Sequence, residues 1–190
     1  ITTCPNVSYM VMTKDHKSIK INNPIDMPES NEIDILLEPY IKAEIISPSE
    51  FIGAIMKLCV SKRATYLSTN YLSANKVQLN YNMPLGEIIY DFFEKLKSIS
   101  KGYASLDYEL IERQPGDLVK LDIRLAGDIV DALSIIIHRN NAYRHGASLC
   151  KRLKEEIHRQ QFEIPIQASI GGKIISRETV RAVRKNVTAK

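Results

Sequence analysis

The most constraining feature of the sequence is a regular succession of strand and helix patterns between residues 39 and 112. Residues 39–46 alternate in the manner of a β-strand. Next, Ser47-Pro48-Ser49-Glu50 predicts a helix that starts at Pro48, with Ser47 as N-cap and Glu50 completing a capping box. The helix should bury a stripe of apolar residues at helical spacing, namely Phe51, Ile52, Ile55, Met56, Leu58 and Cys59.

The second half of this region repeats the pattern. Residues 65–72 and 76–82 read as strands, and Pro84 ends the second of them. A helix is predicted over 85–100, with Gly102 as a C-cap residue and a last strand at 103–112. The apolar face of the predicted helix 85–100 should comprise Ile88, Ile89, Phe92, Phe93, Leu96 and Ile99. The order β-α-β-β-α-β is that of the ferredoxin-like fold, which hosts many functions and cannot name one by itself.

The flanking segments suggest further units around this core. Residues 8–13 and 17–22 form a predicted hairpin, and the Pro-containing stretch 22–32 reads as a connection, which puts a domain edge near Glu38. After residue 113 we expect an apolar strand, a short polar loop around 140–143 and a helix beginning near Gly146. The predicted organisation is therefore 1–37, 38–113 and 114–190, with an α/β (α+β) class throughout.

Charge is distributed unevenly along the chain. Residues 1–113 carry 12 Lys and Arg against 14 Asp and Glu, whereas residues 114–190 carry 14 against 8. The net positive charge of the whole chain, +4, thus belongs to its last third. Such an asymmetry favours a polyanionic partner for the C-terminal part.

The segment 159–190 concentrates this basic character. Arg177, Arg181, Arg184 and Lys185 follow helical spacing, so that a helix here would present four cations on one face. Such a face suits phosphates, although a solvated helix side has the same pattern. The candidate RNA-contacting residues of the C-terminal part are Arg139, Arg144, Lys151, Lys154, Arg159, Lys173, Arg177, Arg181, Arg184 and Lys185.

Two motifs resemble catalytic or metal sites but lack essential parts. Gly171-Gly172-Lys173 has Gln167 where a phosphate loop needs its first glycine and Ile174 where it needs Ser or Thr, so a tight turn is the better interpretation. His138 and His145 lie near no further ligand at zinc spacing and no orienting carboxylate. We expect them, with Arg139 and Arg144, in a polar loop that touches RNA backbone. No catalytic, cofactor-binding or metal residue is predicted.

Strand tyrosines raise the question of base stacking on a sheet. The ferredoxin-like region contains Tyr66, Tyr71, Tyr81, Tyr103 and Tyr108. The RNP1 consensus sequence of single-strand RNA-binding domains is absent, however. Core and edge packing is the preferred interpretation, since tyrosine is favoured in strands.

The cysteines and the apolar segments bear on compartment. Cys4, Cys59 and Cys150 are odd in number and widely separated, which indicates neither a disulfide framework nor a metal pair and favours a reducing cytosol. The chain begins with Ile, without a leader or an apolar run of spanning length, and reads as part of something longer.

Longer stretches resemble a known family. The combination of PLGEII (84–89) with FFEKLKSISKGYASLDYELI (92–111) is similar to the C-terminal ferredoxin-like domain that the translational GTPases share with elongation factor G. DLVKLDIRLAGDIVDALSIIIHR (117–139) and RQQFEIPIQASIGGKIISRETVRAVRKNV (159–187) resemble the special C-terminal domain of LepA proteins, which elongation factor G lacks. Residues 1–37 look like the closing hairpin of that family's third domain. Residues 146–150 match less closely, because Ser148 and Cys150 replace more typical charged and aliphatic residues.

This resemblance implies a function. The family binds the ribosome, hydrolyses GTP and acts on stalled or mistranslocated complexes, with its C-terminal domain reaching the tRNA in the A site. GTP and Mg are then expected for the parent protein and no cofactor for this chain. The implied partners are ribosomal RNA and tRNA in the cytoplasm, with peripheral association at the inner membrane a further expectation for the parent. The competing hypotheses are a stand-alone RNA-binding module and a small enzyme on a ferredoxin-like scaffold.

Overall fold

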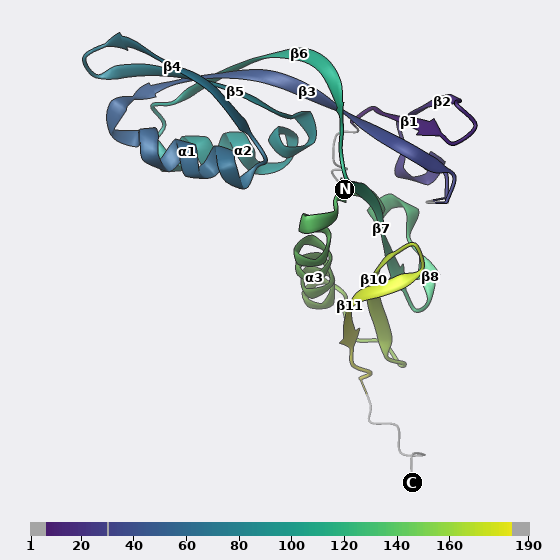
Figure 1. Cartoon of the computed structure of the whole chain (residues 1–190). Coiled ribbons are helices and arrows are strands. Elements are labelled where there is room, and N and C mark those ends of the chain that lie inside the picture. Colours follow the sequence, from purple (N-terminus) through teal and green to yellow (C-terminus); the bar gives the residue numbers. More distant parts are fainter. Residues whose placement is uncertain (1–6, 30, 184–190) are drawn as a thin grey trace. The chain divides into compact units, whose positions relative to one another are not determined.

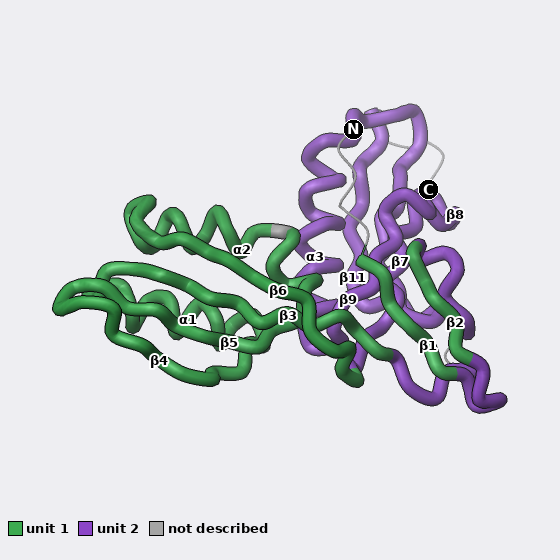
Figure 2. The backbone as a smooth tube through the Cα atoms, turned by 90° about the horizontal axis from the view of Figure 1, so that it is seen from above, with its two compact units in different colours: residues 1–12, 18–22, 37–115 green, residues 13–17, 23–36, 116–190 purple. Residues whose placement is uncertain are grey.

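The computed structural model describes residues 7–29 and 31–183, and these residues form two compact units. Of the described residues, unit 1 comprises 7–12, 18–22 and 37–115, and unit 2 comprises 13–17, 23–29, 31–36 and 116–183, as the colours of Figure 2 show. Each unit contains a β-sheet with helices packed against it (Figure 1). The two units are described separately.

Unit 1 has the predicted order of elements. The strands are β3 (Ile33–Pro48), β4 (Thr65–Ser73), β5 (Lys76–Pro84) and β6 (Ser105–Pro115). Helices α1 (Ile52–Ser61) and α2 (Leu85–Ile99) follow β3 and β5 and lie together on one face of the sheet (Figure 1). The spatial order β4-β5-β3-β6 is antiparallel throughout and confirms the ferredoxin-like arrangement.

The start of the first helix differs from the prediction. Strand β3 continues through Pro48, a short 3-10 turn (Ser49–Phe51) follows, and α1 begins only at Ile52. No side chain caps the helix, and the Ser47 hydroxyl donates instead to the Pro48 carbonyl over 3.3 Å. The capping-box prediction was therefore wrong, because pairing of β3 with β5 holds Ser47 and Pro48 in the extended conformation.

Strand β3 is also longer than expected and contains a proline. It extends from Ile33 to Pro48, and its pairing with β6 shifts register between Glu38 and Tyr40. Pro39 lies in that irregularity, where its missing N–H costs no ladder hydrogen bond. After helix α2, Gly102 has φ +86° and its N–H donates to the Lys97 carbonyl over 2.8 Å, so it closes the turn that ends the helix. The C-cap residue is Ser100, two positions before the predicted Gly102.

The core of unit 1 lies between the sheet and its two helices. Most of the predicted helix stripes are confirmed, with Ile55 and Cys59 of α1 and Phe92 and Leu96 of α2 fully buried. Burial raises the pKa of the Cys59 thiol to about 12, as expected for a cysteine in the core. Phe93 is the exception. It is half exposed, and the Lys97 ammonium lies 5.4 Å from its ring centroid.

The N-terminal hairpin is present. Strands β1 (Tyr9–Thr13) and β2 (Ser18–Ile21) pair antiparallel, and the six-stranded sheet runs β2-β1-β3-β5-β4, with β6 also on β3. A 3-10 turn (Pro24–Asp26) follows the hairpin.

Unit 2 has a five-stranded sheet covered by one helix. The strands are β7 (Leu118–Leu125), β8 (Asp128–Ile129), β9 (Ile135–His138), β10 (Ile164–Ile170) and β11 (Lys173–Val180). Their order is β11-β10-β7-β8, with β9 also pairing with β7. Helix α3 (Arg139–Glu156) lies between β9 and β10 in the chain (Figure 1).

Two predictions for unit 2 were wrong. Helix α3 begins at Arg139 instead of near Gly146, so the predicted polar loop forms its first turns. Arg177 lies in strand β11, not in a helix, because 173–180 pairs along its length with β10. Arg181 follows the strand and is in no helix, and the other two cations of that predicted face, Arg184 and Lys185, lie outside the described residues. The tight turn at Gly171-Gly172 is confirmed, because both glycines have positive φ and join β10 to β11.

Helix α3 approaches the sheet most closely at Gly146. A Cβ atom at this position would lie 2.9 Å from the Cβ of Ala168 on β10 and 3.6 Å from a methyl of Leu121 on β7. The helix side that includes Ala142, Gly146 and Cys150 is buried. It packs over a core in which Leu121, Ile123, Ile166 and Ala168 are fully buried.

This contact predicts the effect of a larger side chain. Gly146→Val should lower the free energy of unfolding by about 1–3 kcal/mol, because its side chain must displace strand β10 or the helix. The same substitution at Gly53, which lies in α1 with nothing within 4 Å, is the matched control and should be tolerated. Denaturant unfolding of both variants measures the difference. Equal stability of the two would show that the helix does not depend on this contact.

Candidate nucleic-acid interface

The buried side of α3 determines which cations face solvent. At 100° per residue, the side of the helix opposite Ala142, Gly146 and Cys150 carries a second set of side chains. Arg144, Lys151, Ser148 and Glu155 lie on this side, with His145 and Arg152 at its edge, and all six are exposed. We call Arg144, His145, Lys151 and Arg152 the basic helix face. Arg152 was not among the predicted contacts. Because α3 extends from Arg139 to Glu156, it includes both His145 and Arg152, and their seven-residue spacing puts Arg152 on the same side of the helix as His145.

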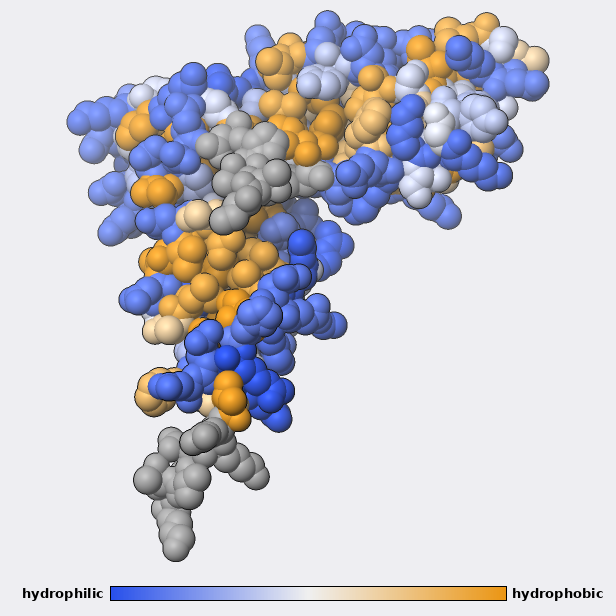
Figure 3. Space-filling view, turned by 180° about the vertical axis from the view of Figure 1, so that it is seen from behind, coloured by the Kyte–Doolittle hydropathy of each residue, from blue (hydrophilic) through white to orange (hydrophobic). Residues whose placement is uncertain are grey.

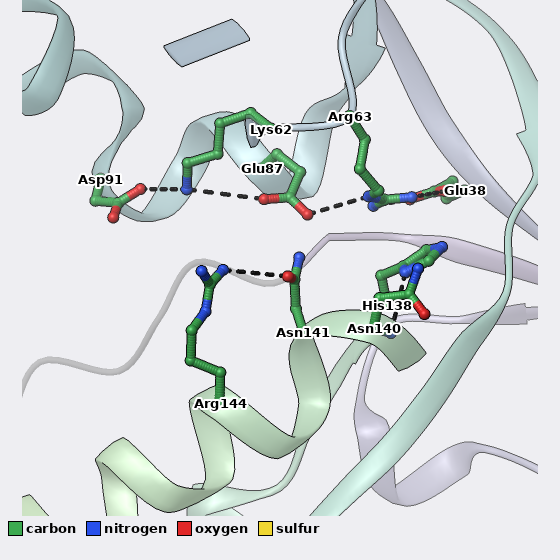
Figure 4. A network of polar contacts seen from close by, with 9 residues as sticks. All are labelled: Glu38, Lys62, Arg63, Glu87, Asp91, His138, Asn140, Asn141 and Arg144. Carbon is green, nitrogen blue, oxygen red and sulfur yellow. Dashed lines mark hydrogen bonds and ion pairs between the residues drawn. The ribbon is translucent and has the colours of Figure 1, made fainter. Parts of the chain in front are cut away.

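The electrostatics of this face keep its histidine neutral. Desolvation lowers the pKa of His145, and the charges of Arg152 and Arg144 lower it further. The imidazole is thus a neutral hydrogen-bonding group among fixed cations at physiological pH. Arg144 donates to the Asn141 side-chain oxygen over 3.2 Å, which orients the guanidinium along the helix (Figure 4).

The other predicted histidine has a structural role. His138 is the N-cap of α3, and its Nδ1 accepts the backbone N–H of Asn140 at 3.3 Å (Figure 4). Arg139 is anchored as well, since its Nε lies 3.0 Å from both carboxylate oxygens of Asp117. In residues 7–29 and 31–183, no group of three His, Cys, Asp or Glu side chains could hold a metal ion.

A second group of cations surrounds two adjoining depressions at the C-terminal ends of α3 and β11, which share Lys154, Thr179 and Arg181. We call them together the terminal depression. Arg177, Glu163 and Glu178 line one of the two, and Glu155, His158 and Arg159 line the other. Lys154 is paired with Glu178 over 2.6 Å. Figure 3 shows hydrophilic residues around a few hydrophobic ones at this end of unit 2, next to the grey C-terminal atoms.

The structure therefore separates the predicted contacts into distinct groups. Arg144 and Lys151 lie on the basic helix face, Arg159, Arg177 and Arg181 line the terminal depression, and Lys173 is exposed at the β10–β11 turn. Arg139 and Lys154 are ion-paired. Among residues 116–183, seven exposed cations have no carboxylate oxygen within 4.0 Å, namely Arg144, Lys151, Arg152, Arg159, Lys173, Arg177 and Arg181.

Unit 1 pairs its central cations within the unit. Arg63 binds the buried carboxylate of Glu38 through two hydrogen bonds of 2.7 and 3.0 Å, and its Nε donates to Glu87 over 3.2 Å. Lys62 lies 3.7 Å from Glu87 and 2.5 Å from Asp91, as Figure 4 shows. This network ties β3 and the end of α1 to α2 and leaves its charges compensated.

The tyrosines of unit 1 do not form a stacking platform on the open sheet face. Directly paired residues share a face, and the register pairs Tyr66 with Tyr81, Tyr71 with Val77 and Tyr108 with Ala43. Tyr81, Val77 and Ala43 are buried beneath the helices. Packing is confirmed for Tyr81, whose ring lies 5.7 Å from that of Tyr66 in an edge-to-face contact. The exposed rings of Tyr66, Tyr71 and Tyr108 are on the edge strands.

The Gly171-Gly172-Lys173 turn cannot act as a phosphate loop. It joins two antiparallel strands, whereas a phosphate loop connects a strand to the N-terminus of a helix. In the part of the chain that the structure describes, this turn therefore does not provide a site for a nucleotide phosphate and its metal ion. Among these residues, no helix has both the length and the apolar character needed to cross a membrane.

Two family models match the chain and divide it between them. The model described as elongation factor G C-terminus matches residues 35–124. The model described as GTP-binding protein LepA C-terminus matches residues 125–190. Together with the ferredoxin-like unit 1, these matches define the class as a translation elongation factor whose elongation-factor-G-type domain is followed by a LepA-type region.

Comparison with individual proteins gives the family. Over 190 residues the chain is 57% identical to elongation factor 4 of Bacteroides fragilis, 54% to that of Clostridium novyi and 53% to that of Halalkalibacterium halodurans. All of this chain is covered, but only 31 or 32% of each relative, so the chain spans about a third of their length. The chain belongs to the elongation factor 4 family, also called LepA, and the recognition made from its sequence is confirmed.

The ion network of unit 1 predicts a pH dependence. Burial alone would raise the pKa of Asp91, but hydrogen bonds from Lys62 and Lys95 outweigh it and hold the pKa below 3.8. The stabilisation by the Asp91 ion pairs is therefore complete above pH 3.8, the usual pKa of an aspartate, and it is lost as the pH falls through the lower pKa of Asp91 in the folded state. Thermal unfolding should show Asp91→Asn less stable than wild type at neutral pH, with the difference shrinking on acidification. Glu94→Gln, an exposed position on the same helix, should show no such pH-dependent difference.

Proposed function

We propose that this chain is the ribosome- and tRNA-contacting part of a translation factor that acts on stalled or mistranslocated ribosomes. The observation that carries the proposal is the group of seven exposed cations between residues 116 and 183 that have no carboxylate oxygen within 4.0 Å among the described residues. Surface cations usually balance neighbouring acids, whereas a cluster left uncompensated attracts a polyanion. Membership of the elongation factor 4 family makes ribosomal RNA and tRNA the natural polyanions.

The two units divide the work in this proposal. Unit 1, with its paired central charges, acts as the scaffold, and unit 2 meets RNA phosphates through the basic helix face, Lys173 and the terminal depression. We interpret residues 38–113 as the ferredoxin-like domain, 114–190 as the family-specific domain and 1–37 as a remnant of the preceding domain. Arg139, Lys154, Arg184 and Lys185 stay among the proposed contacts, the first two through their ion-paired but exposed side chains.

The parent protein is proposed to bind GTP and Mg and to hydrolyse GTP on the ribosome in the cytoplasm. This chain contributes contacts and not hydrolysis. Peripheral membrane association of the parent stays a prediction, which sedimentation with anionic lipid vesicles would test. A stand-alone RNA-binding module would share the basic surface, but the family relationship along the whole chain favours the translation factor.

Charge reversal on the basic helix face tests the RNA proposal. Arg144→Glu combined with Arg152→Glu should weaken binding to ribosomes and to tRNA by tenfold or more and reduce the salt dependence of binding. Each phosphate that the variant no longer neutralises should flatten the log-log salt slope by about 0.9 for double-helical RNA, by analogy with B-DNA. Filter binding at several salt concentrations measures both quantities. The fold should persist in circular dichroism, because both side chains face solvent.

The matched control reverses two exposed cations of unit 1. Lys57→Glu combined with Lys76→Glu makes the same change in net charge on a unit whose role is proposed to be structural. Its RNA affinity and salt slope should stay close to those of the wild type. Equal losses in both double variants would mean that only net charge matters, and no loss in either would remove RNA contact by this face.

The division of labour within the parent protein has its own test. The chain alone should neither bind labelled GTP nor release phosphate from it, with or without ribosomes, because Gly171-Gly172-Lys173 is a hairpin turn and no complete phosphate-loop motif occurs in the sequence. Equilibrium dialysis and a phosphate-release assay give the answer. Saturable micromolar binding would contradict the proposal and favour the enzyme alternative.

A further inference from the structure

The connection between α3 and β10 contributes His158, Arg159 and Glu163 to the lining of the terminal depression, and it also exposes an aromatic ring. Residues 157–163 link the two elements, and Phe162 is 79% exposed, the most exposed of the large hydrophobic side chains in the described residues. An aromatic side chain this exposed forgoes the burial that normally stabilises it. Binding of a partner that covers the ring would therefore be favourable.

The backbone around Phe162 is held in place on both sides. The Ile157 N–H donates to the Leu153 carbonyl over 2.8 Å, and the Ile157 side chain packs against the core of unit 2. Further along, the Gln160 carbonyl accepts the Val183 N–H over 2.9 Å, which ties the connection to the segment after β11. The exposure of Phe162 is thus a property of an anchored segment.

Two cations lie near position 162 along the backbone. Arg159 precedes it by three residues, and Arg181 lies between Val180, which pairs with Ile164, and Val183, which is hydrogen-bonded to Gln160. Arg159 and Arg181 both line the terminal depression, and neither has a carboxylate within 4.0 Å among the described residues. The acids nearby are Glu155, Glu163 and Glu178, and Glu178 is already paired with Lys154. An exposed aromatic ring beside uncompensated guanidinium groups combines the two elements that bind unpaired nucleotides, a stacking surface and phosphate contacts.

We propose that Phe162 stacks on an unpaired base of bound RNA whose flanking phosphates are held by Arg159 and Arg181. Double-helical RNA hides its base faces within the stack, so only a single-stranded end, loop or bulge presents a base to this ring. The inference rests on the proposed RNA-contacting function and refines it. The basic helix face binds backbone regardless of strandedness, whereas the terminal depression selects single-stranded RNA.

The first experiment compares RNA probes. Wild-type chain and Phe162→Ala are titrated with a short labelled single-stranded oligonucleotide and with a duplex of the same sequence. The variant should bind the single strand roughly ten-fold more weakly, as expected when a base no longer stacks on an aromatic ring, with the salt slope unchanged. Duplex binding should be unaffected. Arg159→Gln with Arg181→Gln should instead reduce the salt slope.

A fluorescence measurement reports stacking directly. The chain contains no tryptophan, so Phe162→Trp introduces a single indole, and Tyr71→Trp places one at a similarly exposed site on β4 of unit 1. Single-stranded RNA should quench the indole at 162 and leave the one at 71 unchanged. Stacking on a base and loss of solvent exposure both predict reduced quenching by acrylamide in the complex.

The possible failures are distinguishable. If Phe162→Ala binds both probes like the wild type while charge reversal on the helix face still weakens binding, the stacking inference is overturned and the proposed function stands. If no variant and no probe shows salt-dependent binding, the RNA function itself fails. If the indole at 162 is buried without RNA and sedimentation shows a dimer, a second copy of the chain covers the ring and the inference is likewise overturned.

Discussion

The close approach of α3 to strand β10 at Gly146 determines which side chains of the helix face solvent in unit 2. The helix can lie against Ala168 only because position 146 has no side chain, since a Cβ there would sit 2.9 Å from the Ala168 Cβ. That contact fixes the rotation of the helix about its axis. Once Ala142, Gly146 and Cys150 face the sheet, Arg144, Lys151 and Arg152 must face solvent. The packing of α3 against the sheet therefore also determines which of its charged side chains face solvent.

The two units treat their charges in opposite ways. In unit 1 the Glu38 carboxylate, 3% exposed, receives two hydrogen bonds from Arg63, and Glu87 and Asp91 complete a network that stabilises the contacts of α2. Breaking such a pair leaves a buried charge uncompensated, so its members are structural. The exposed cations of unit 2 carry no such penalty. They can exchange water and counterions for RNA phosphates, which is the chemistry expected of a translation factor that meets the ribosome.

Particular residues show where sequence patterns were sufficient. The periodic burial of Ile55, Cys59, Phe92 and Leu96 follows from helical spacing alone, and the Gly171-Gly172 turn follows from the conformational freedom of glycine. Local patterns failed where pairing between distant segments prevailed. Ser47 has the residue type and neighbours of an N-cap, but it lies within strand β3, which pairs with β5. Arg177 has helical spacing from Arg181, but it lies in strand β11, which pairs with β10. Phe93 follows the buried spacing yet lies half exposed.

The sequence by itself determined the family, the order of elements in unit 1 and the concentration of positive charge in the last third of the chain. These are properties of residue order and composition, which need no third dimension. Tertiary structure alone decided that His138 caps a helix, that Arg139 and Lys154 are ion-paired and that Arg152 shares a face with Arg144. It also decided that Phe162 stays exposed in a segment whose backbone is held next to that of Arg181. The physical reason is that burial and charge compensation depend on neighbours brought together from distant positions, as Lys154 and Glu178 are.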